Sequence, residues 1–474
     1  MPPTAHVSRI SAEHTPPTTA HVSRISAAIT IFACTISGGL LTLPAVFSSA
    51  SLLVSLLLVL FSAVTTFCSL LALVILSEMY ECVGYGNLVG VLFGSNSKHI
   101  INLTIGLFLV GVIGSSFIVV QDFFLEEFPR YSKLATICAG VIVLGLSMPQ
   151  KMGALSLAAS FSMLSFSFLV VTLVYYGTIE ITSNMNTTVP WLPSRKQTFM
   201  DHISVAATAI PVILYAFGCQ IQIFDIYESI GRTTSRGLKE AKTRKTSFIE
   251  IRYFVPVMLA AVTLMVLLFS FTGIFGILSF PNQVIEGDVL KNLESKGIMG
   301  SIARGMLVLA CILAAPLIVN PTQISLGAFV EHFVLPGDIS INDYRFGRIL
   351  LTFFIVGGAV TLAVSGINFL VVVGALGAFI CSPLFFILPG GMLCLAMRRN
   401  NVNNDGITNQ TLDEALLINN NSTEEFASVA ANEETSTLLF SSRERCAVNF
   451  ISAWLVVMGI FTFFISIWKF IDQH

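Results

Sequence analysis

The chain has 474 residues, of which 54% are hydrophobic and 11% are charged, and its mean hydropathy is +0.83. Soluble proteins contain about 25% charged residues, so this composition leaves too little charge to cover a water-soluble globule of this length. It excludes soluble enzymes, nucleic-acid-binding proteins and fibrous proteins, and the formal net charge of −2 gives no reason to expect a polyanionic partner. We expect an all-α polytopic membrane protein, because the apolar stretches reach the roughly 20 residues that a helix needs to cross a bilayer.

Apolar runs separated by polar segments predict eleven transmembrane helices. In the first half of the chain these runs cover residues 26–49, 51–77, 100–125, 134–149, 154–180 and 202–227. In the second half they cover residues 252–278, 299–330, 347–365, 368–396 and 447–470. The fourth run is short and the eighth is long, which predicts a tilt or a break in those two helices.

Polar segments divide the chain into four parts. Residues 1–25 are expected to be a cytosolic N-terminal tail, which contains the near-duplicated sequence PPTAHVSRISA and has no apolar signal peptide. Residues 26–397 would then form a ten-helix core. Residues 398–445 are rich in Asn and acidic residues, which predicts a disordered cytosolic loop. Residues 446–474 are expected to contain the eleventh helix.

The distribution of Lys and Arg predicts the orientation in the membrane. Most of these residues lie on the side that carries the segment 228–252 and the loop 398–445. The positive-inside rule therefore places the N-terminus in the cytosol. The sequon at Asn186 then falls in a non-cytosolic loop and is a candidate glycosylation site. The plasma membrane and the vacuolar or lysosomal membrane fit equally well.

Two of the predicted spans contain residues that interrupt helices. The first span contains the run from Ser37 to Pro44, SGGLLTLP, and in the sixth span Pro211 and Gly218 bracket an aromatic segment. Unwound backbone is tolerated in hydrocarbon only where it lines a cavity. Two breaks five spans apart favour two inverted repeats of five helices, with the eleventh helix as an addition. The alternative is a pair of kinked helices that pack through small residues.

Breaks of this kind leave N–H groups at the start of one half-helix and carbonyl groups at the end of another. The N–H groups attract a carboxylate, and the carbonyl groups attract an ammonium group. An amino acid carries both on one carbon atom, so it is a natural ligand for such a site. A cavity without fixed charge would favour neutral amino acids over charged ones.

Four segments follow the spacing of a known family. The pattern Gly-x-Gly-x-Leu-x-Leu-Pro-x-Ala-Phe corresponds to residues 37–47, and Phe-Ala-Phe-x-Cys-His followed by Ile-Tyr-x-Glu-Leu corresponds to residues 215–220 and 226–230. The pattern Val-Pro-x-x-x-Phe-Pro is similar to residues 315–321, and a tenth-helix motif is similar to residues 374–375 and 386–389. The chain therefore resembles the amino acid/auxin permease family over about residues 25–470.

The resemblance implies a secondary amino acid transporter that works by alternating access, with an eleven-helix, 5+5 inverted-repeat fold of the APC/LeuT type, and not an enzyme; no cofactor is expected. It places the substrate carboxylate on the backbone near Gly38, Gly39 and Leu40, with a contribution from the Ser37 hydroxyl. It places the substrate amino group against carbonyl groups near Tyr215, Ala216 and Phe217. Selectivity for the side chain would come from the third and eighth helices, at Ser115, Ser116 and Ile312.

The coupling ion is predicted from departures from the family pattern. Sodium-coupled members resemble one another in having Asn and Thr at two positions where this chain has Ala33 and Ala314. Alanine side chains offer no oxygen to a hard cation, so proton coupling or facilitated transport is expected rather than sodium coupling. Asp225 and Glu228 lie one turn apart beyond the sixth-span break and are candidate proton-coupling residues.

The remaining acidic residues at helix ends, Asp122, Glu126 and Glu127 among them, are expected to be interfacial or to form ion pairs that act as a gate. Two other functions stay open: an amino acid-sensing receptor that signals through residues 398–445, and a transporter of another small solute such as an auxin-like acid or a polyamine. The histidines lie in tails or near helix ends, which disfavours an enzyme or a metal centre. The expected partners are an amino acid, protons and the lipid bilayer, with no nucleic acid.

Overall fold

The computed structural model describes residues 24–35, 38–80, 82–148, 152–183, 199–228, 244–281, 283–333, 345–399 and 442–472. Over these residues the regular structure is entirely helical, with no strand. Eight helical segments are long and apolar enough to cross a membrane, and three shorter helices are also apolar. The prediction of an all-α integral membrane protein is therefore confirmed. Ser37, Asn186, most of the tail and residues 400–441 lie outside the described residues.

The helices of the first half are α1 (Arg24–Thr35), α2 (Gly39–Ala50), α3 (Leu52–Tyr80), α4 (Tyr85–Phe93), α5 (Ser95–Glu127), α6 (Ser132–Leu146), α7 (Met152–Ser183) and α8 (Phe199–Ala216). A further helical stretch covers residues 223–228. The second half contains α10 (Arg244–Ser279), α11 (Val289–Leu293), η1 (Glu294–Lys296), α12 (Gly297–Phe333), α13 (Arg345–Val364), α14 (Phe369–Leu376), η2 (Gly377–Cys381), η3 (Pro383–Ile387) and α17 (Ser442–Asp472). Helix continues beyond η3 through residues 388–399.

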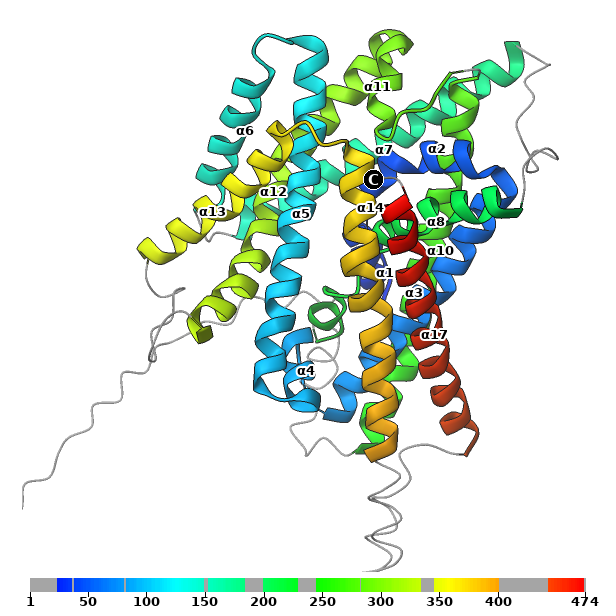
Figure 1. Cartoon of the computed structure of the whole chain (residues 1–474), viewed down its shortest axis with the longest axis vertical. Helices are drawn as coiled ribbons and strands as arrows, with labels where there is room; N and C mark the ends of the chain where they lie inside the picture. The colour runs from blue at the N-terminus through cyan, green and yellow to red at the C-terminus, as the bar shows by residue number, and fades with distance from the viewer. Residues whose placement is uncertain are drawn as a thin grey trace, which may run out of the picture.

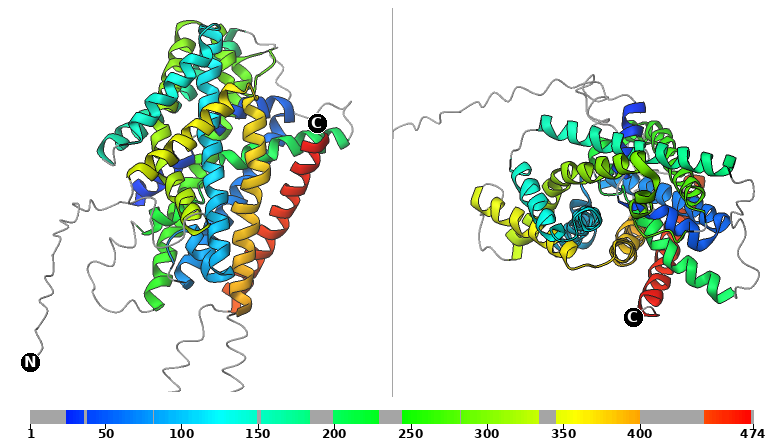
Figure 2. Two further views of the ribbon diagram at one scale, coloured as in Figure 1. Left: turned by 60° about the vertical axis from the view of Figure 1, so that its left-hand side comes forward. Right: turned by 90° about the horizontal axis from the view of Figure 1, so that it is seen from above.

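The helices pack into two groups. One group consists of α2, α3, α8 and α10, and the other consists of α5, α6, α12 and α13. Figure 1 and the right-hand view in Figure 2 show the second group on the left and the first group on the right. The helix α7 joins the groups because it packs against both α10 and α12. Side chains such as Leu57, Val141 and Phe354 are exposed on the outer faces, where a bilayer would cover them.

The eighth span was predicted to be tilted or broken, and it is not broken. The helix α12 runs from Gly297 to Phe333 without interruption, and both Pro316 and Pro321 lie inside it. Neighbouring helices allow a membrane helix to continue through a proline, and α12 is packed against α5 on one side and α7 on another. The fourth span is confirmed as short, because α6 has 15 residues.

The tenth span changes its hydrogen bonding at η2 and η3, which are π-helical. Pro389 has no N–H group, so the carbonyl of Phe385 lacks its donor in an α-helical pattern and the carbonyl of Leu384 lacks its donor in a π-helical one. The hydroxyl groups of Ser69 and Tyr85 donate to these two carbonyl oxygens. Ser69 on α3 and Tyr85 on α4 thus supply donors to the two carbonyl groups that the missing N–H of Pro389 affects.

Candidate functional site at two interrupted helices

In the middle of the first predicted span, Gly38 lies in a turn and not in a helix. The helix α1 is described as far as Thr35, α2 begins at Gly39, and residues 36 and 37 lie outside the described residues. Gly38 occupies the N-cap position of α2 and has no side chain that could accept a hydrogen bond from the first N–H groups of the helix. The N–H groups of Gly39 and Leu40 stand at the first two helical positions, where no carbonyl group of the same helix can accept from them.

The sixth span is also interrupted, which confirms the second prediction. The helix α8 ends at Ala216, residues 217–222 are not helical, and a helical stretch resumes at residue 223. The N–H of Gly218 donates to the carbonyl of Tyr215 at 3.1 Å, three residues back instead of four. Pro211 lies inside α8 and does not end it. The last carbonyl groups of a helix lack the donors that a continuing helix would supply; here the carbonyl of Ile213 still accepts the N–H of Phe217 at 3.1 Å, and that of Tyr215 accepts the N–H of Gly218.

The two interruptions touch each other. A Cβ atom added to Gly39 would lie 2.7 Å from the Cα atom and 2.8 Å from the Cβ atom of Ala216. The start of α2 and the end of α8 are thus in contact at the backbone, which a larger residue than glycine at position 39 would prevent. The N-terminal end of a helix carries a partial positive charge and the C-terminal end a partial negative charge. Here the two ends are neighbours.

Two further helices complete the site. The hydroxyl of Ser115 on α5 lies 3.1 Å from the hydroxyl of Tyr215 on α8, and both residues are buried. A Cβ atom on Gly38 would lie 3.1 Å from the ring of Phe369 on α14 and 3.7 Å from the Ser115 hydroxyl. Residues from α2, α5, α8 and α14 therefore converge, and the residues named here are uncharged.

Some predicted residues do not join this cluster. The hydroxyl of Ser116 donates to the carbonyl of Val112 in its own helix at 3.1 Å. Ile312 is partly buried against the apolar core. Asp225 is exposed and Glu228 is partly buried on the helical stretch that follows the second break.

The stretch that carries these two carboxylates is tied to α3. The hydroxyl of Tyr227 donates to Oε1 of Glu78, at the end of α3, at 2.7 Å. Asp225 and Glu228 lie close enough to interact electrostatically. The structure thus places the two candidate proton-coupling residues near each other and beyond the break.

Several residues at the site had no signal in the sequence. Phe369 is the side chain nearest to Gly38, and Cys311 and Cys381 lie close enough to Tyr215 to interact with it electrostatically. The ring of Phe108 meets that of Tyr215 edge to face, with 6.2 Å between centroids. Which helices face the breaks is determined by tertiary packing, which the sequence pattern does not reveal.

Gln220 occupies the non-helical segment after α8. Its Oε1 atom accepts the N–H of Cys219 at 2.9 Å. Its Nε2 atom is buried and has no hydrogen-bond partner among the described residues. A buried amide donor without an acceptor costs free energy, so a ligand with an acceptor group would satisfy it.

Ion pairs join α5 to the start of the second half of the chain. Arg304 on α12 is 1% exposed and pairs with Glu126 and, at 3.3 Å, with Glu127. Lys291 on α11 pairs with Asp122 at 3.0 Å. Of the two predicted alternatives, interfacial residues or ion pairs that act as a gate, these acidic residues form ion pairs; their action as a gate stays a prediction. The side of the molecule that carries α11 and these pairs is called the α11 face below; it is uppermost in Figure 1.

These features define an integral membrane protein in which two interrupted helices meet at a buried, uncharged site. The model of a protein family described as transmembrane amino acid transporter protein matches residues 20–417, most of the chain. The chain therefore belongs to this family, in agreement with its resemblance to the amino acid/auxin permeases. Members of the family are transporters and not enzymes.

Proposed function

We propose that the protein is a secondary transporter that moves neutral amino acids across a membrane by alternating access. The observation that carries this proposal is the backbone contact between Gly39 and Ala216. It brings the N–H end of α2 beside the carbonyl end of α8. An α-amino acid has its carboxylate and ammonium groups on one carbon atom, so it would use both ends at once.

In this proposal the substrate carboxylate binds the N–H groups at Gly39 and Leu40, next to Gly38 and with help from Ser37. The substrate ammonium group binds carbonyl groups at Tyr215, Ala216 and Phe217. The side chain extends toward the α5 wall. Ser115 supports this direction because its hydroxyl lies beside both Gly38 and Tyr215. Ser116, whose hydroxyl bonds within α5, would contribute only by fixing the shape of that helix turn.

The absence of charge among these contacts supports a neutral substrate. A lysine or arginine substrate would bring a second positive charge into the buried site, and a buried charge needs a partner of opposite sign. An aspartate or glutamate substrate would need an added cation in the same way. Small or medium neutral amino acids avoid both costs.

The arrangement of helices supports alternating access on an inverted repeat. Each packing group contains helices five spans apart: α3 lies with α10, and α5 with α12. Eight spans, together with α6 and the two interrupted spans, would give eleven transmembrane helices, of which α17 is the addition. Rocking of one group against the other would expose the site to each side in turn.

We further propose that transport is proton-coupled or facilitative and does not use sodium, because Ala33 and Ala314 offer no side-chain oxygen. Asp225 and Glu228 are the proton-coupling candidates from sequence. The N-terminus would be cytosolic, Asn186 would be the glycosylation candidate, and the membrane would be the plasma membrane or that of a vacuole or lysosome.

The test is uptake of a labelled neutral amino acid into proteoliposomes that contain the purified full-length chain. A panel of all common amino acids serves as competitors, under an imposed proton gradient or an imposed sodium gradient. We expect competition by neutral amino acids and no response to sodium. Accumulation driven by sodium would refute the argument from the two alanines. Binding without any flux would contradict transport and would favour the sensing function.

A further inference from the structure

The strongest unassigned group in the molecule is the carboxyl of Asp288, which precedes α11. Its Oδ1 atom accepts the N–H of Leu290 at 2.9 Å, so it caps this short helix. Its Oδ2 atom is buried and has no hydrogen-bond partner among the described residues. The residue is 2% exposed. A helix cap needs only one oxygen atom, which Oδ1 supplies. Capping therefore does not explain why Oδ2 is buried without a partner.

The charged and titratable groups around Asp288 come from three helices. Asp122 and Glu126 belong to α5, Lys291 belongs to α11, and Cys311 belongs to α12. The ammonium group of Lys291 is already paired with Asp122 at 3.0 Å. An ionised carboxylate with a bare oxygen would therefore be buried beside two other acidic groups, which is costly. Burial is the main cause that raises the pKa of Asp288 to about 7.

Asp288 lies close to the proposed substrate site. Cys311 lies near both Asp288 and Tyr215. Asp122 lies seven residues beyond Ser115 on α5, which is about 10 Å along the helix. The carboxyl is thus connected to the proposed site through Cys311 and through the helix α5.

The burial of Asp288 depends on how the α11 segment, residues 283–296, is docked. The helix α11 packs against α2 and α5. A Cβ atom on Gly287 would lie 2.7 Å from the Cβ atom of Leu370 on α14, so the chain before Asp288 is pressed against the tenth span. All three of these neighbours also contribute residues to the proposed site.

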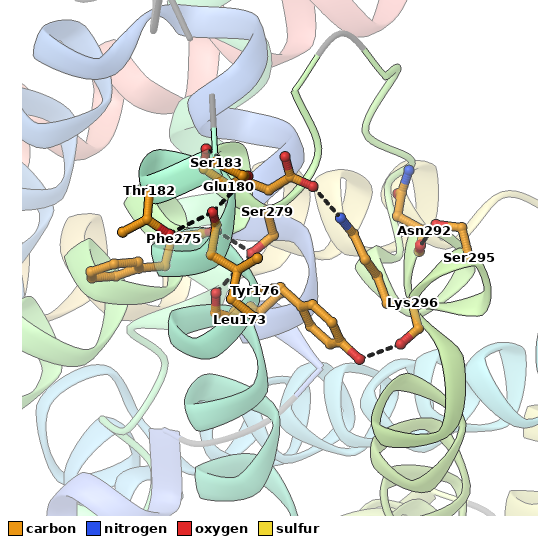
Figure 3. A network of polar contacts seen from close by, with 11 residues as sticks. Leu173, Tyr176, Glu180, Thr182, Ser183, Phe275, Ser279, Asn292, Ser295 and Lys296 are labelled. Atoms are coloured by element: carbon orange, nitrogen blue, oxygen red, sulfur yellow. Dashed lines mark hydrogen bonds and ion pairs between the residues drawn. The ribbon is translucent and has the colours of Figure 1, made fainter. Parts of the chain in front are cut away.

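The other end of the α11 segment is anchored to α7, as Figure 3 shows. Lys296 pairs with Glu180 at 3.1 Å, and the hydroxyl of Tyr176 donates to the carbonyl of Lys296. The ammonium group of Lys296 also lies 5.3 Å from the centre of the Phe280 ring. The segment is thus held at its Lys296 end, and lifting it from α2 would hydrate the Asp288 end.

We propose that Asp288 carries the proton in a proton-coupled transport cycle. With the α11 segment lifted, Oδ2 takes up one proton from water at the α11 face, and the segment docks over the substrate with the carboxyl neutral. When the opposite side opens, the same O–H bond breaks and the proton passes to water that enters the substrate site. One O–H bond forms and one breaks in each cycle, and no oxidant or reductant is involved. The inference rests on the proposed transport function.

Asp225 is less suited to this role in the present conformation because it is exposed. Partial burial and the nearby Glu228 raise the pKa of Asp225, but its exposed side chain keeps contact with water when the site closes. Asp288 has a stronger reason to hold a proton, since docking removes its water. The two assignments make different predictions for the same assay.

The experiment compares Asp288→Asn with the wild-type chain in proteoliposomes. Asparagine keeps the shape and the oxygen that caps α11, but it cannot exchange a proton. Two quantities are measured for one neutral amino acid: accumulation driven by a proton gradient, and counterflow, the exchange of labelled for unlabelled substrate without a gradient. We expect the variant to lose accumulation, with its concentration ratio falling to unity, and to retain counterflow.

Further variants are measured in the same assay so that each result either supports or contradicts the inference. Asp288→Ser also caps a helix and cannot titrate in this range, so it replaces the asparagine variant if that protein does not fold. Asp225→Asn and Glu228→Gln test the other assignment in the same assay, and loss of accumulation in these variants but not in the Asp288 variants would overturn the inference. Accumulation that survives in both Asp288 variants would overturn the inference, as would a wild-type protein that exchanges substrate but never responds to the proton gradient. A wild-type protein without any exchange would instead contradict the proposed function itself.

Discussion

At the scale of single residues, the site depends on the absence of a side chain at Gly39. Gly39 is buried, and its Cα hydrogen atoms face the backbone of Ala216. If the two helix ends moved apart by the width of a methyl group, a zwitterion could no longer span from the N–H groups of α2 to the carbonyl groups of α8. The close approach is therefore a condition for the proposed binding mode.

Replacing Gly39 by alanine is expected to abolish uptake. The new Cβ atom would lie 2.7 Å from the Cα atom of Ala216, a backbone atom that cannot rotate away. Overpacking of this kind also costs about 1–3 kcal/mol of stability. The measurements are uptake in proteoliposomes and thermal unfolding of the purified protein.

The matched control for this change is Gly357→Ala on α13. A Cβ atom at Gly357 would meet no atom within 4 Å, so this variant should transport as the wild type does. Wild-type uptake by Gly39→Ala would show that the backbone contact is not needed and would remove the main support for the binding mode.

The sequence predicts the residues of the breaks but not the residues that face them. Gly38 and Gly39, like Gly218 after α8, interrupt helices for local reasons that any inspection of the chain reveals. Phe369 and Cys311 follow no local rule, because each belongs to an ordinary apolar helix and reaches the site through the packing of distant spans. Ser115 and Ser116 are adjacent on α5, and only the packing tells which of them faces Tyr215.

At the scale of elements, the tenth span depends on hydroxyl donors from α3 and α4. Its π-helical turns place the carbonyl groups of Leu384 and Phe385 where Pro389 offers no N–H. The hydroxyl groups of Ser69 and Tyr85 meet this need. Segments of π-helix occur at functional sites, and this one directly follows α14, which carries Phe369.

The variants Ser69→Ala and Tyr85→Phe test this dependence. Each removes the donor to one buried carbonyl oxygen, and an unsatisfied buried group costs about 1–3 kcal/mol. We expect each variant to unfold at a lower temperature than the wild type, and the double variant to be lower still. Thr263→Ala is the control, because the Thr263 hydroxyl bonds within its own helix at an exposed position. Equal stability of the double variant and this control would show that water or other groups supply the donors.

Proline illustrates why interrupted elements were only partly predictable. Pro211 lies in a span that was predicted to break, and Pro316 lies in the long span that was predicted to be tilted or broken. The helix α8 continues past Pro211 to Ala216, and α12 continues past Pro316 to Phe333. A proline removes one hydrogen bond, and the helices packed around it determine whether the helix ends or continues. The actual ends lie at glycine-containing segments, where the backbone is free to turn away.

At the scale of the whole molecule, α5 and α12 form an antiparallel pair with different chemistry at its two ends. At one end Arg304 pairs with Glu126 and Glu127. At the other end the rings of His99 and His332 are stacked, with 3.7 Å between their centroids. The spans that contain α5 and α12 are five apart in the chain, so the sequence predicts that these two helices cross the membrane in opposite directions. The register that pairs these particular residues depends on side-chain packing along both helices.

The titration of Asp288 extends to the stability of the whole molecule. Its pKa is about 7 in the folded protein, and the ordinary value of 3.8 applies once the chain is unfolded. The folded state therefore binds the proton more tightly, so the free energy of unfolding increases as the pH falls through 7 and decreases as the pH rises through 7. This gain is complete only below the unfolded value. Between about pH 8 and about pH 6 the change amounts to about 1 kcal/mol.

The measurement is the unfolding temperature of the detergent-purified protein across this pH range, for the wild type and for Asp288→Asn. We expect the wild type to become more stable toward pH 6 and the variant to show a flatter profile, because asparagine carries no charge at either pH. Other titrating groups act in both proteins and cancel in the difference between the two profiles. Parallel profiles would mean that Asp288 keeps its charge state on unfolding, and the carboxyl would then have no proton to carry.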